Sequence, residues 1–343
     1  MGHPYPIREI ARQAGLSEAT VDRVLNNRPG VRASTVGNVQ QAITDLDRQR
    51  SQLRLSGRAF LVDVVMQAPD RFSSAVKAAL EAELPSMRPA VVRSRFDFRE
   101  KSRPGDIVKV LNDIRHRGSK GVVLKAPDLP EITDAIARLD EAGIPVVTLV
   151  TDIPLSRRVA YVGIDNRAAG STAAYLVDRM LGDGQGDVLI ALSRSVFRGE
   201  EEREIGFRAT MRNRFAARAL IEQTDTDGLD AVVRESTLRT LEQNPGVNAV
   251  YSVGGGNQAI LEAFDAAERR CQVFVGHDLD RDNLQLLHDE RLTAVLHHDL
   301  RYDMRLACHI IMQAHGAIEG PIESVRSPIH IVTPHNIPGL PTT

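Results

Sequence analysis

The stretch IREIARQAGLSEATVDRVLNNRPGVRASTVGNVQQAITDL, residues 7–46, predicts three short helices in a helix-turn-helix layout. Apolar and small residues recur at helical spacing from Ile7 to Ala14, and Gly15 ends that run. Ser17 is expected to cap a second helix over Glu18–Leu25, and a third helix is expected to open at Thr35. The spacing predicts that these helices turn one apolar face inward, at Val21, Val24, Leu25, Val36, Val39, Ala42, Ile43 and Leu46.

The charge of the chain is divided unevenly around this stretch. The first 58 residues hold nine arginines and five acidic residues, a net charge of +4. Because all 343 residues together carry −2, the rest of the chain carries −6. A basic N-terminal module on an acidic body is typical of polyanion binding at one end, although a solvated charged surface has the same composition.

Residues 7–46 closely resemble the DNA-binding headpiece of the LacI/GalR (lactose-repressor) family of bacterial transcription regulators. In a helix-turn-helix the second helix enters the major groove of DNA. The resemblance implies that base edges are read by Glu18, Ala19 and Arg23, and that phosphates or the DNA backbone are contacted by Ser17, Thr20 and Asn26.

Three side chains of the second helix differ in how strongly their chemistry points to DNA. Arg23 is the best candidate for base reading, because arginine can donate two hydrogen bonds to guanine. Glu18 either accepts from cytosine or simply stabilises the first turn of its helix. Asp22 stands where the family more often has serine, so we expect a repulsive or structural role for it.

The segment DRQRSQLRLSGR, residues 47–58, follows where the family has a hinge that becomes helical on DNA. Apolar side chains can wedge into the minor groove, and Leu53 or Leu55, flanked by Arg54, are the candidates. This hinge otherwise binds through phosphates, or it is a plain linker. The predicted boundaries are a headpiece over 1–47 and a hinge over 48–58.

Beyond residue 58 the sequence contains eleven short apolar runs that alternate with helical patterns. The runs are FLVDVVM, AVVRSRF, GVVLKA, PVVTLV, VAYVGI, DVLIAL, ARALIE, NAVYSV, QVFVG, TAVLH and SPIHIV. Runs of this kind are typical of buried parallel strands with crossover helices between them. Eleven strands exceed what one compact sheet normally holds, so we predict an α/β fold with two subdomains and a ligand cleft between them.

The body, residues 59–343, resembles the periplasmic sugar-binding-protein fold that forms the effector domain of the same family. The motifs that carry the resemblance are YVGIDNRAAGSTAAYL, VNAVYSVGGGNQAILEAF and VFVGHDLD. It implies parallel sheets with helices on both faces. The expected N-subdomain covers about 59–163 with a segment near 298–325, and the expected C-subdomain covers about 164–297 with about 326–340.

By position in this fold, four polar residues fall where family members bind sugar hydroxyls: Asp152, Arg203, Asp278 and His298. Carboxylates accept from hydroxyls, a guanidinium donates to them, and a histidine can do either. The alternative for the two aspartates is the capping of a helix. Where the family commonly has an Asn-Asp pair, this chain has three glycines around Gly255, so either a bulkier effector approaches there or backbone amides bind it.

Aromatic residues make up only 4% of the chain, with no tryptophan, so few rings can stack on a sugar. Phe72 is the first candidate and Phe197 the second, while the alternative for both is packing in the core. Gln67, Asp70 and Arg71 lie near Phe72 in the sequence and are expected at the same pocket.

No motif of the chain assembles into a catalytic or metal site. Ser74 and Lys77 have the spacing of one family of nucleophiles but lack its companion triplet, and the aspartates at 278, 280 and 282 lack the glycine and glutamate of a calcium loop. Two cysteines, Cys271 and Cys308, cannot form a disulfide framework. We therefore expect no enzyme, no cofactor and no metal.

These features predict a ligand-responsive transcription regulator, most simply a repressor. Its expected partners are a palindromic operator DNA, a sugar or sugar-like effector and a second copy of the chain, with no membrane. No signal sequence is visible, which predicts a cytoplasmic protein, associated with the nucleoid when it is bound to its operator. The rival predictions are a sugar-binding protein of a transport system and a carbohydrate-active enzyme.

Overall fold

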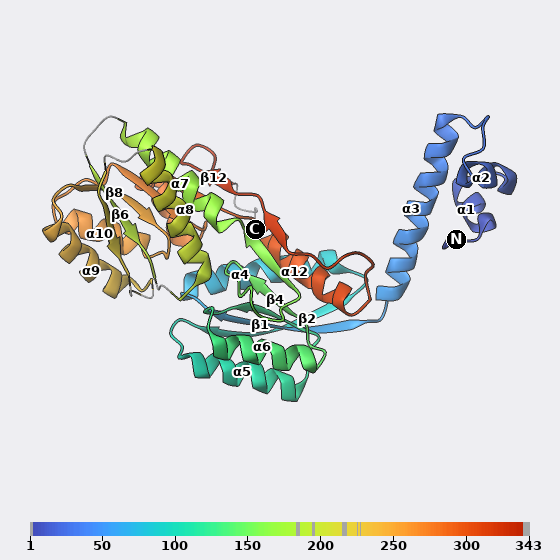
Figure 1. Cartoon of the computed structure of the whole chain (residues 1–343), viewed down its shortest axis with the longest axis horizontal. Helices are drawn as coiled ribbons and strands as arrows, with labels where there is room; N and C mark the ends of the chain where they lie inside the picture. Colours follow the sequence, from blue (N-terminus) through green and yellow to red (C-terminus); the bar gives the residue numbers. More distant parts are fainter. Residues whose placement is uncertain are drawn as a thin grey trace.

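The structure is a computed structural model in which residues 3–182, 186–193, 196–214, 218–224, 226 and 228–338 are described. A three-helix unit at the N-terminal end lies apart from a two-part α/β body, and its long third helix leads into the body (Figure 1).

The N-terminal unit is formed by α1 (Ile7–Ala14), α2 (Glu18–Leu25) and the first part of α3 (Ala33–Leu55). Gly15 ends α1 with a φ of 65°, a left-handed conformation that glycine adopts without steric conflict. Ser17 caps α2 by accepting a hydrogen bond from the backbone N–H of Thr20, as the sequence predicts. The three helices enclose a small core made of Tyr5, Ile10, Ala11, Val21, Val39, Ala42 and Leu46.

The third helix differs from the sequence-based expectation at both ends. It begins at Ala33 rather than Thr35 and continues without a break to Leu55, through most of the predicted hinge. Leu55 is 9% exposed and packs in a core cluster of the body, whereas Leu53 is 77% exposed. The body therefore holds Leu55, and only Leu53 remains as a candidate wedge. The side chain of Arg54 lies outside the described residues.

The first subdomain of the body is a six-stranded sheet in the order β11-β5-β4-β3-β1-β2, with every neighbouring pair parallel. Its strands are β1 (Ala59–Gln67), β2 (Val91–Arg99), β3 (Gly121–Lys125), β4 (Val146–Leu149), β5 (Ala160–Ile164) and β11 (Val325–Ser327). One face is covered by α4 (Asp70–Glu83), the short helix η1 (Leu84–Met87) and α12 (Leu300–Ala314). The other face is covered by α5 (Pro104–Arg117) and α6 (Pro130–Glu141).

The second subdomain is a six-stranded sheet in the order β12-β10-β9-β8-β6-β7. Its strands are β6 (Asp187–Ala191), β7 (Leu220–Gln223), β8 (Val247–Ser252), β9 (Val273–His277), β10 (Ala294–His297) and β12 (His330–Val332). One face packs on α7 (Asn166–Leu181) and α8 (Arg198–Arg214). The other packs on α9 (Asp230–Gln243), α10 (Asn257–Ala266) and α11 (Arg281–His288).

The chain passes between the subdomains three times: from β5 into α7, from β10 into α12, and from β11 into β12. The run SPIHIV, predicted as one strand, contains the end of β11 and all of β12, which belong to different sheets. The last passage therefore lies between Ser327 and His330, slightly later than the expected boundary near 325. β12 also pairs antiparallel with β10, where parallel sheets were predicted.

Helices α7 and α8 cross in backbone contact at two glycines. A Cβ atom on Gly170 would lie 1.9 Å from the carbonyl oxygen of Arg203, and one on Gly206 would lie 2.1 Å from that of Arg167. Because these are backbone atoms, a larger residue cannot be accommodated without moving a helix. The crossing therefore fixes the position of Arg203 in the second subdomain.

Two further features are the length and polarity of the helices and the state of the cysteines. Within the described ranges, no helix is both long and apolar enough to cross a bilayer. Both cysteines are unpaired thiols, with Cys308 buried beside β4 and α4 and Cys271 half-buried near the start of β9.

We predict that Gly170→Ala lowers the free energy of unfolding by about 1–3 kcal/mol, the usual effect of overpacking. Urea unfolding followed by circular dichroism measures it. Gly105→Ala is the matched control, since a Cβ on Gly105 in α5 meets nothing within 4 Å. Equal stability of the two variants would contradict a tight crossing of α7 and α8.

Candidate functional site

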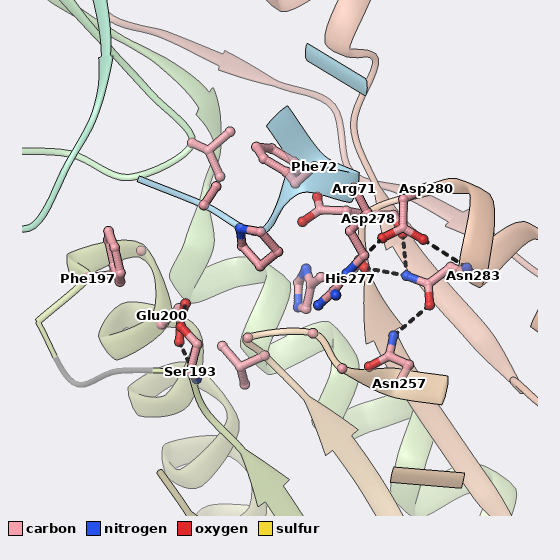
Figure 2. Close-up of a pocket in the computed structure, with 18 of the residues that line it drawn as sticks. Arg71, Phe72, Ser193, Phe197, Glu200, Asn257, His277, Asp278, Asp280 and Asn283 are labelled. Atoms are coloured by element: carbon pink, nitrogen blue, oxygen red, sulfur yellow. Dashed lines mark hydrogen bonds and ion pairs between the residues drawn. The ribbon is translucent and has the colours of Figure 1, made fainter. Parts of the chain in front are cut away.

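A cavity lies between the two subdomains, where strands of both sheets end (Figure 2). It encloses about 950 Å³, counting the space at its open mouth. The first subdomain contributes residues that end or follow β1, β3 and β4, and the second contributes residues that follow β6, β8 and β9. Ligands of α/β proteins bind at this edge, because it gathers the loops of neighbouring parallel strands.

The first-subdomain wall presents an amide, two cations and an aromatic ring. Gln67 ends β1, Arg71 and Phe72 stand in the first turn of α4, and Lys125 ends β3. Phe72 is 7% exposed, so it both lines the cavity and packs in the core. The Lys125 ammonium lies 6.0 Å from the centre of the Phe72 ring and 4.3 Å from that of Phe197.

The second-subdomain wall presents a carboxylate and a guanidinium around the start of α8. Glu200 accepts two hydrogen bonds from Ser193, one from the backbone N–H at 2.8 Å and one from the hydroxyl at 2.5 Å. Arg203 is 3% exposed and donates from Nε to the amide oxygen of Asn166 at 2.8 Å. Phe197 also lines this wall, as the sequence expectation proposes.

The glycine turn after β8 leaves room for the side chain of Arg71, a contact that was not expected from the sequence. Gly255 has a φ of 88°, and a Cβ atom there would lie 2.7 Å from Nη2 of Arg71. The room left by the absent side chain is thus occupied by a side chain of the opposite subdomain.

Arg71 joins the two walls. Its Nη2 donates to the carbonyl oxygen of Gly228 at 2.9 Å, and it pairs with Asp230 at 3.6 Å and with Asp280 at 3.4 Å. All three partners belong to the second subdomain, while Arg71 belongs to the first. Burial raises the pKa of Asp280 to about 6, and the charge of Arg71 opposes that rise. The subdomains are therefore bridged in this structure.

Asp278 is held at the cavity by a buried charge chain. It follows β9 with a φ of 64°, which is strained for a residue that is not glycine. Its carboxylate lies 3.4 Å from Nε2 of His298, whose Nδ1 lies 2.5 Å from the carboxylate of Asp303. Ser327 of β11 donates to the other oxygen of Asp303, so this series of side-chain contacts reaches the first sheet.

Opposite charges set the protonation of this chain. Burial alone would lower the pKa of His298, but its contacts with Asp278 and Asp303 raise it to about 9. Burial alone would raise the pKa of Asp278, but His298 and Arg203 hold it far below its usual range. A histidinium between two carboxylates thus keeps Asp278 ionised and oriented toward the cavity.

Several buried polar atoms of the cavity residues have no hydrogen-bond partner within the described part of the chain. They are Oε1 of Gln67, Nη2 of Arg203, Oδ1 of Asn257, Nδ1 of His277 and Oδ1 of Asp278. Buried polar groups are normally satisfied, so a set of donors and acceptors left over at one cavity indicates a polar ligand. Burial also lowers the pKa of His277 well below its usual value, which leaves this ring neutral.

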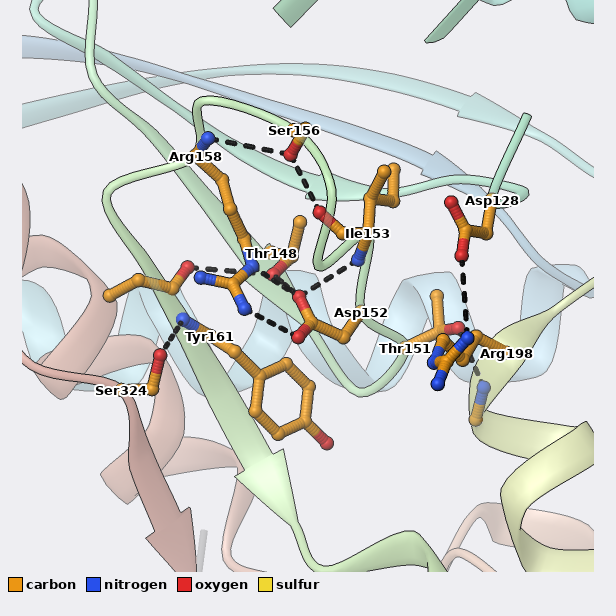
Figure 3. A network of polar contacts seen from close by, with 12 residues as sticks. Asp128, Thr148, Thr151, Asp152, Ile153, Ser156, Arg158, Tyr161, Arg198 and Ser324 are labelled. Carbon is orange, nitrogen blue, oxygen red and sulfur yellow. Dashed lines mark hydrogen bonds and ion pairs between the residues drawn. The ribbon is translucent and has the colours of Figure 1, made fainter. Parts of the chain in front are cut away.

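Three residues expected at the ligand do not line the cavity. Asp152 is turned away and forms an ion pair with Arg158, while its carboxylate also accepts from Thr148 at 2.7 Å and from the N–H of Ile153 at 2.8 Å (Figure 3). Asp70 is exposed at the start of α4. His298 is fully buried behind Asp278 and reaches the cavity only through it.

Other residues line the cavity without having been expected there, among them Lys125, Glu200, Asn257, His277 and Asn283. Lys125 carried a usable signal, because it is the polar residue that ends the buried run GVVLKA. Asn257 and Asn283 are held by each other, the Nδ2 of Asn257 donating to Oδ1 of Asn283 at 2.7 Å. That pairing joins α10 to α11, and no local pattern in the sequence predicts it.

On the headpiece, α2 presents most of its candidate side chains to solvent. Ser17, Glu18, Ala19, Arg23 and Asn26 are exposed, and Thr20 is half-buried and bonded to Ser17. Arg23 makes no ion pair with any described residue.

Asp22 has an internal role on the same helix. It accepts from the Asn26 amide at 2.8 Å and pairs with Arg28 at 3.1 Å. The departure from the family serine is thus structural, and it partly engages Asn26.

Two family models match the chain. Residues 62–316 match the model of a periplasmic binding protein domain, and residues 6–50 match that of bacterial regulatory proteins of the lacI family. Within the described residues, no group of three or more histidine, cysteine, aspartate or glutamate side chains is placed to hold a metal ion.

The similar proteins include transcription regulators and sugar-binding proteins. The HTH-type transcriptional regulator reg1 of Streptomyces lividans is 30% identical over 49% of this chain, which spans about half (48%) of that relative's length. The HTH-type transcriptional regulator MalR of Streptomyces coelicolor is 26% identical over 74% of this chain and 67% of its own. Among solved structures, the glucose-galactose binding protein GanP of Geobacillus stearothermophilus superposes with a TM-score of 0.73, at 19% identity, over 82% of this chain and 99% of its own. That last likeness concerns the fold.

We predict that Arg71→Met opens the cleft, because it removes three polar contacts between the subdomains. Small-angle scattering would record a larger radius of gyration for this variant than for the native chain. Arg93→Met, at an exposed position on β2, is the control and should leave the radius unchanged. If Arg71→Met has the native radius, the bridge does not hold the subdomains together.

We also predict that His298→Gln flattens the dependence of stability on pH. The folded pKa of His298, about 9, lies above the value of about 6.5 for an unfolded histidine, so its stabilisation is complete below about pH 6.5 and is lost as the pH rises through 9. Urea unfolding at these two pH values should show a larger loss for the native chain than for the variant. His288→Gln, exposed on α11, should behave like the native chain. The same loss in all three proteins would refute a charged His298.

Proposed function

The chain belongs to the periplasmic binding protein domain family and carries an N-terminal helix-turn-helix of the lacI family, and we propose that it is a DNA-binding transcription regulator, a repressor, that responds to a sugar-like effector. The observation that carries the proposal is the direct connection of the two parts. Helix α3 begins in the headpiece, and its last residue, Leu55, packs in the core of the first subdomain.

The proposed DNA-reading surface is the exposed face of α2. Arg23 is available to donate to a guanine, while Glu18 and Ala19 stand in the first turn of the same helix. The basic charge of the first 58 residues suits the phosphate backbone, which supplies most of the non-specific affinity of DNA-binding proteins.

The proposed effector is a sugar or sugar derivative bound in the cavity. Unsatisfied donors and acceptors stand together there, which suits a ligand rich in hydroxyl groups because each hydroxyl both donates and accepts. Phe72 and Phe197 supply apolar surface at the same place. Asp278 is proposed to accept from the hydroxyl groups of the effector and Arg203 to donate to its oxygen atoms, and Gln67 lines the same cavity.

The proposed regulation is a population shift. An effector that contacts both walls binds the closed arrangement more tightly than the open one, and it therefore favours closure. Because the headpiece is attached to the first subdomain through α3, closure changes the orientation of the headpiece relative to the second subdomain. Arg71 provides part of the closed-state stability without any effector.

We propose that the chain acts as a homodimer in the cytoplasm. One headpiece reads a short half-site, whereas two related by a twofold axis double the contacts and match a palindromic operator. The GanP-like sugar-binding fold alone is compatible with transport, but a transport protein has no use for a DNA-reading helix.

We predict that Arg23→Ala weakens binding to the DNA upstream of the gene by about 1–3 kcal/mol, roughly 5- to 150-fold, which is the usual loss for one base-reading arginine. Fluorescence anisotropy with a labelled fragment measures this. Arg93→Ala removes the same charge from an exposed position of the body and should bind normally. The proposal fails if the native chain shows no salt-sensitive binding, or if Arg23→Ala binds as well as Arg93→Ala.

A further inference from the structure

The charges around the cavity are paired unequally. Each of the six carboxylates that line it has a hydrogen-bond or ion-pair partner inside the protein. Glu100 accepts from the N–H of Asp70 and Glu200 accepts from Ser193. The four aspartates form ion pairs: Asp230 and Asp280 with Arg71, Asp278 with His298, and Asp282 with Arg281. Two of its cations have no carboxylate partner of this kind, namely Lys125 and Arg203. Buried charges are normally paired, so this imbalance calls for an anion.

Lys125 has donors to spare. Its ammonium carries three N–H groups, and one donates to the carbonyl oxygen of Gln67 at 3.1 Å. No carboxylate of the described residues lies within 4.0 Å of it, and the ammonium also lies over the Phe197 ring, 4.3 Å from its centre. Lys125 is thus a cation at the end of β3 that faces a cavity instead of an acid.

Arg203 supplies a second donor on the opposite wall. It is 3% exposed, its Nε is bonded to Asn166, and its Nη1 contacts the carbonyl oxygen of Val253 at 3.4 Å. Its Nη2 has no partner in the described part of the chain. Both of its partners are neutral, so its charge is uncompensated by any ion pair.

The charges around Lys125 act on its pKa in opposite directions. Burial lowers the pKa of Lys125 to about 8; the carboxylates of Glu200 and Asp278 oppose this shift, and the charge of Arg203 adds to it. An anion bound between Lys125 and Arg203 would stabilise both charged forms.

We propose that Lys125 and Arg203 form an anion subsite and that the effector is a sugar bearing one acidic group, a carboxylate or a phosphate. This inference rests on the proposed function, because it specifies the ligand of the same cavity. The hydroxyl groups of such a ligand would meet Gln67, Asn257 and Asp278, and its acidic group would lie between the two cations. A cationic sugar would instead find only carboxylates that already have partners.

The experiment is a calorimetric and thermal-shift comparison of matched sugars. D-glucose, D-glucuronate and D-glucose 6-phosphate share one ring, as do D-galactose, D-galacturonate and D-galactose 6-phosphate, and acetate and inorganic phosphate serve as ring-free anions. The proteins are the full native chain, Lys125→Met and Lys120→Met, the last removing one exposed lysine that precedes β3. Anions that bind the headpiece affect all three proteins alike.

The expected result is that an acidic member of a trio binds the native chain more tightly than its neutral parent. Lys125→Met should lose that preference by at least about tenfold, roughly one hydrogen bond to a charged group, and Lys120→Met should keep it. The carboxylate and phosphate arms then identify the acidic group. From pH 7 to pH 9, binding of the acidic sugar to the native chain should also weaken about tenfold more than binding of its neutral parent, as Lys125 loses its proton. Deprotonation of His298 behind Asp278 begins in the same interval and affects both sugars, so the difference between them reports on Lys125. This pH arm needs no variant, so it stands even if Lys125→Met does not fold.

Two results would overturn the anion subsite. If a neutral sugar binds best and Lys125→Met binds it equally well, the sugar-responsive function stands and the acidic effector is wrong. If no probe distinguishes the native chain from Lys125→Met, and no pH dependence is found, the subsite does not exist. Failure of the proposed function is recognised separately, by the absence of salt-sensitive DNA binding.

Discussion

The bridge from Arg71 to Gly228, Asp230 and Asp280 sets the geometry of the functional site. It stands at the start of α4, so a residue of the first subdomain neutralises acids of the second and fills the room left by Gly255. Without it, Asp230 and Asp280 of the second subdomain would lose the cation with which they pair. The cavity exists in its present form because the two sheets bring their carboxyl edges together around this guanidinium.

A second buried contact links the cavity to the rest of the fold. Asp278 contacts His298, His298 contacts Asp303, and Asp303 accepts from Ser327 in the first sheet. These contacts lie close to two of the points at which the polypeptide passes between the subdomains. A ligand that binds Asp278 therefore contacts a side chain whose position depends on residues of both subdomains. The same first subdomain anchors Leu55 at the end of α3. The cavity, through Asp278, and the headpiece, through Leu55, are thus both attached to the first subdomain, which gives a physical route for coupling them.

Local patterns predicted most of this architecture. Gly15 and Ser17 mark the turn of the headpiece, and ten of the eleven apolar runs each correspond to one strand, because such a run is a local property of the sequence. The run SPIHIV instead spans the end of β11 and all of β12. Position after a strand also placed Gln67, Arg71, Phe72 and Asp278 at one edge. Contacts between distant segments left no such signal: Asp152 turns toward Arg158 six residues later, Leu55 packs in the body, and the pairing of Asn257 with Asn283 is set by helix packing. Lys125 was missed although its position at the end of β3 follows the same rule.

Effector binding and DNA binding are coupled through one conformational equilibrium of the protein, and thermodynamic reciprocity is the measurement that tests this coupling. The affinity of the native chain for its upstream DNA is measured with and without a saturating sugar that raises its melting temperature, and the affinity for that sugar is measured with and without the DNA. The account predicts that both affinities change by the same factor, about fivefold or more. If each affinity is unchanged by the other ligand, the cavity and the headpiece are not coupled and the account is wrong.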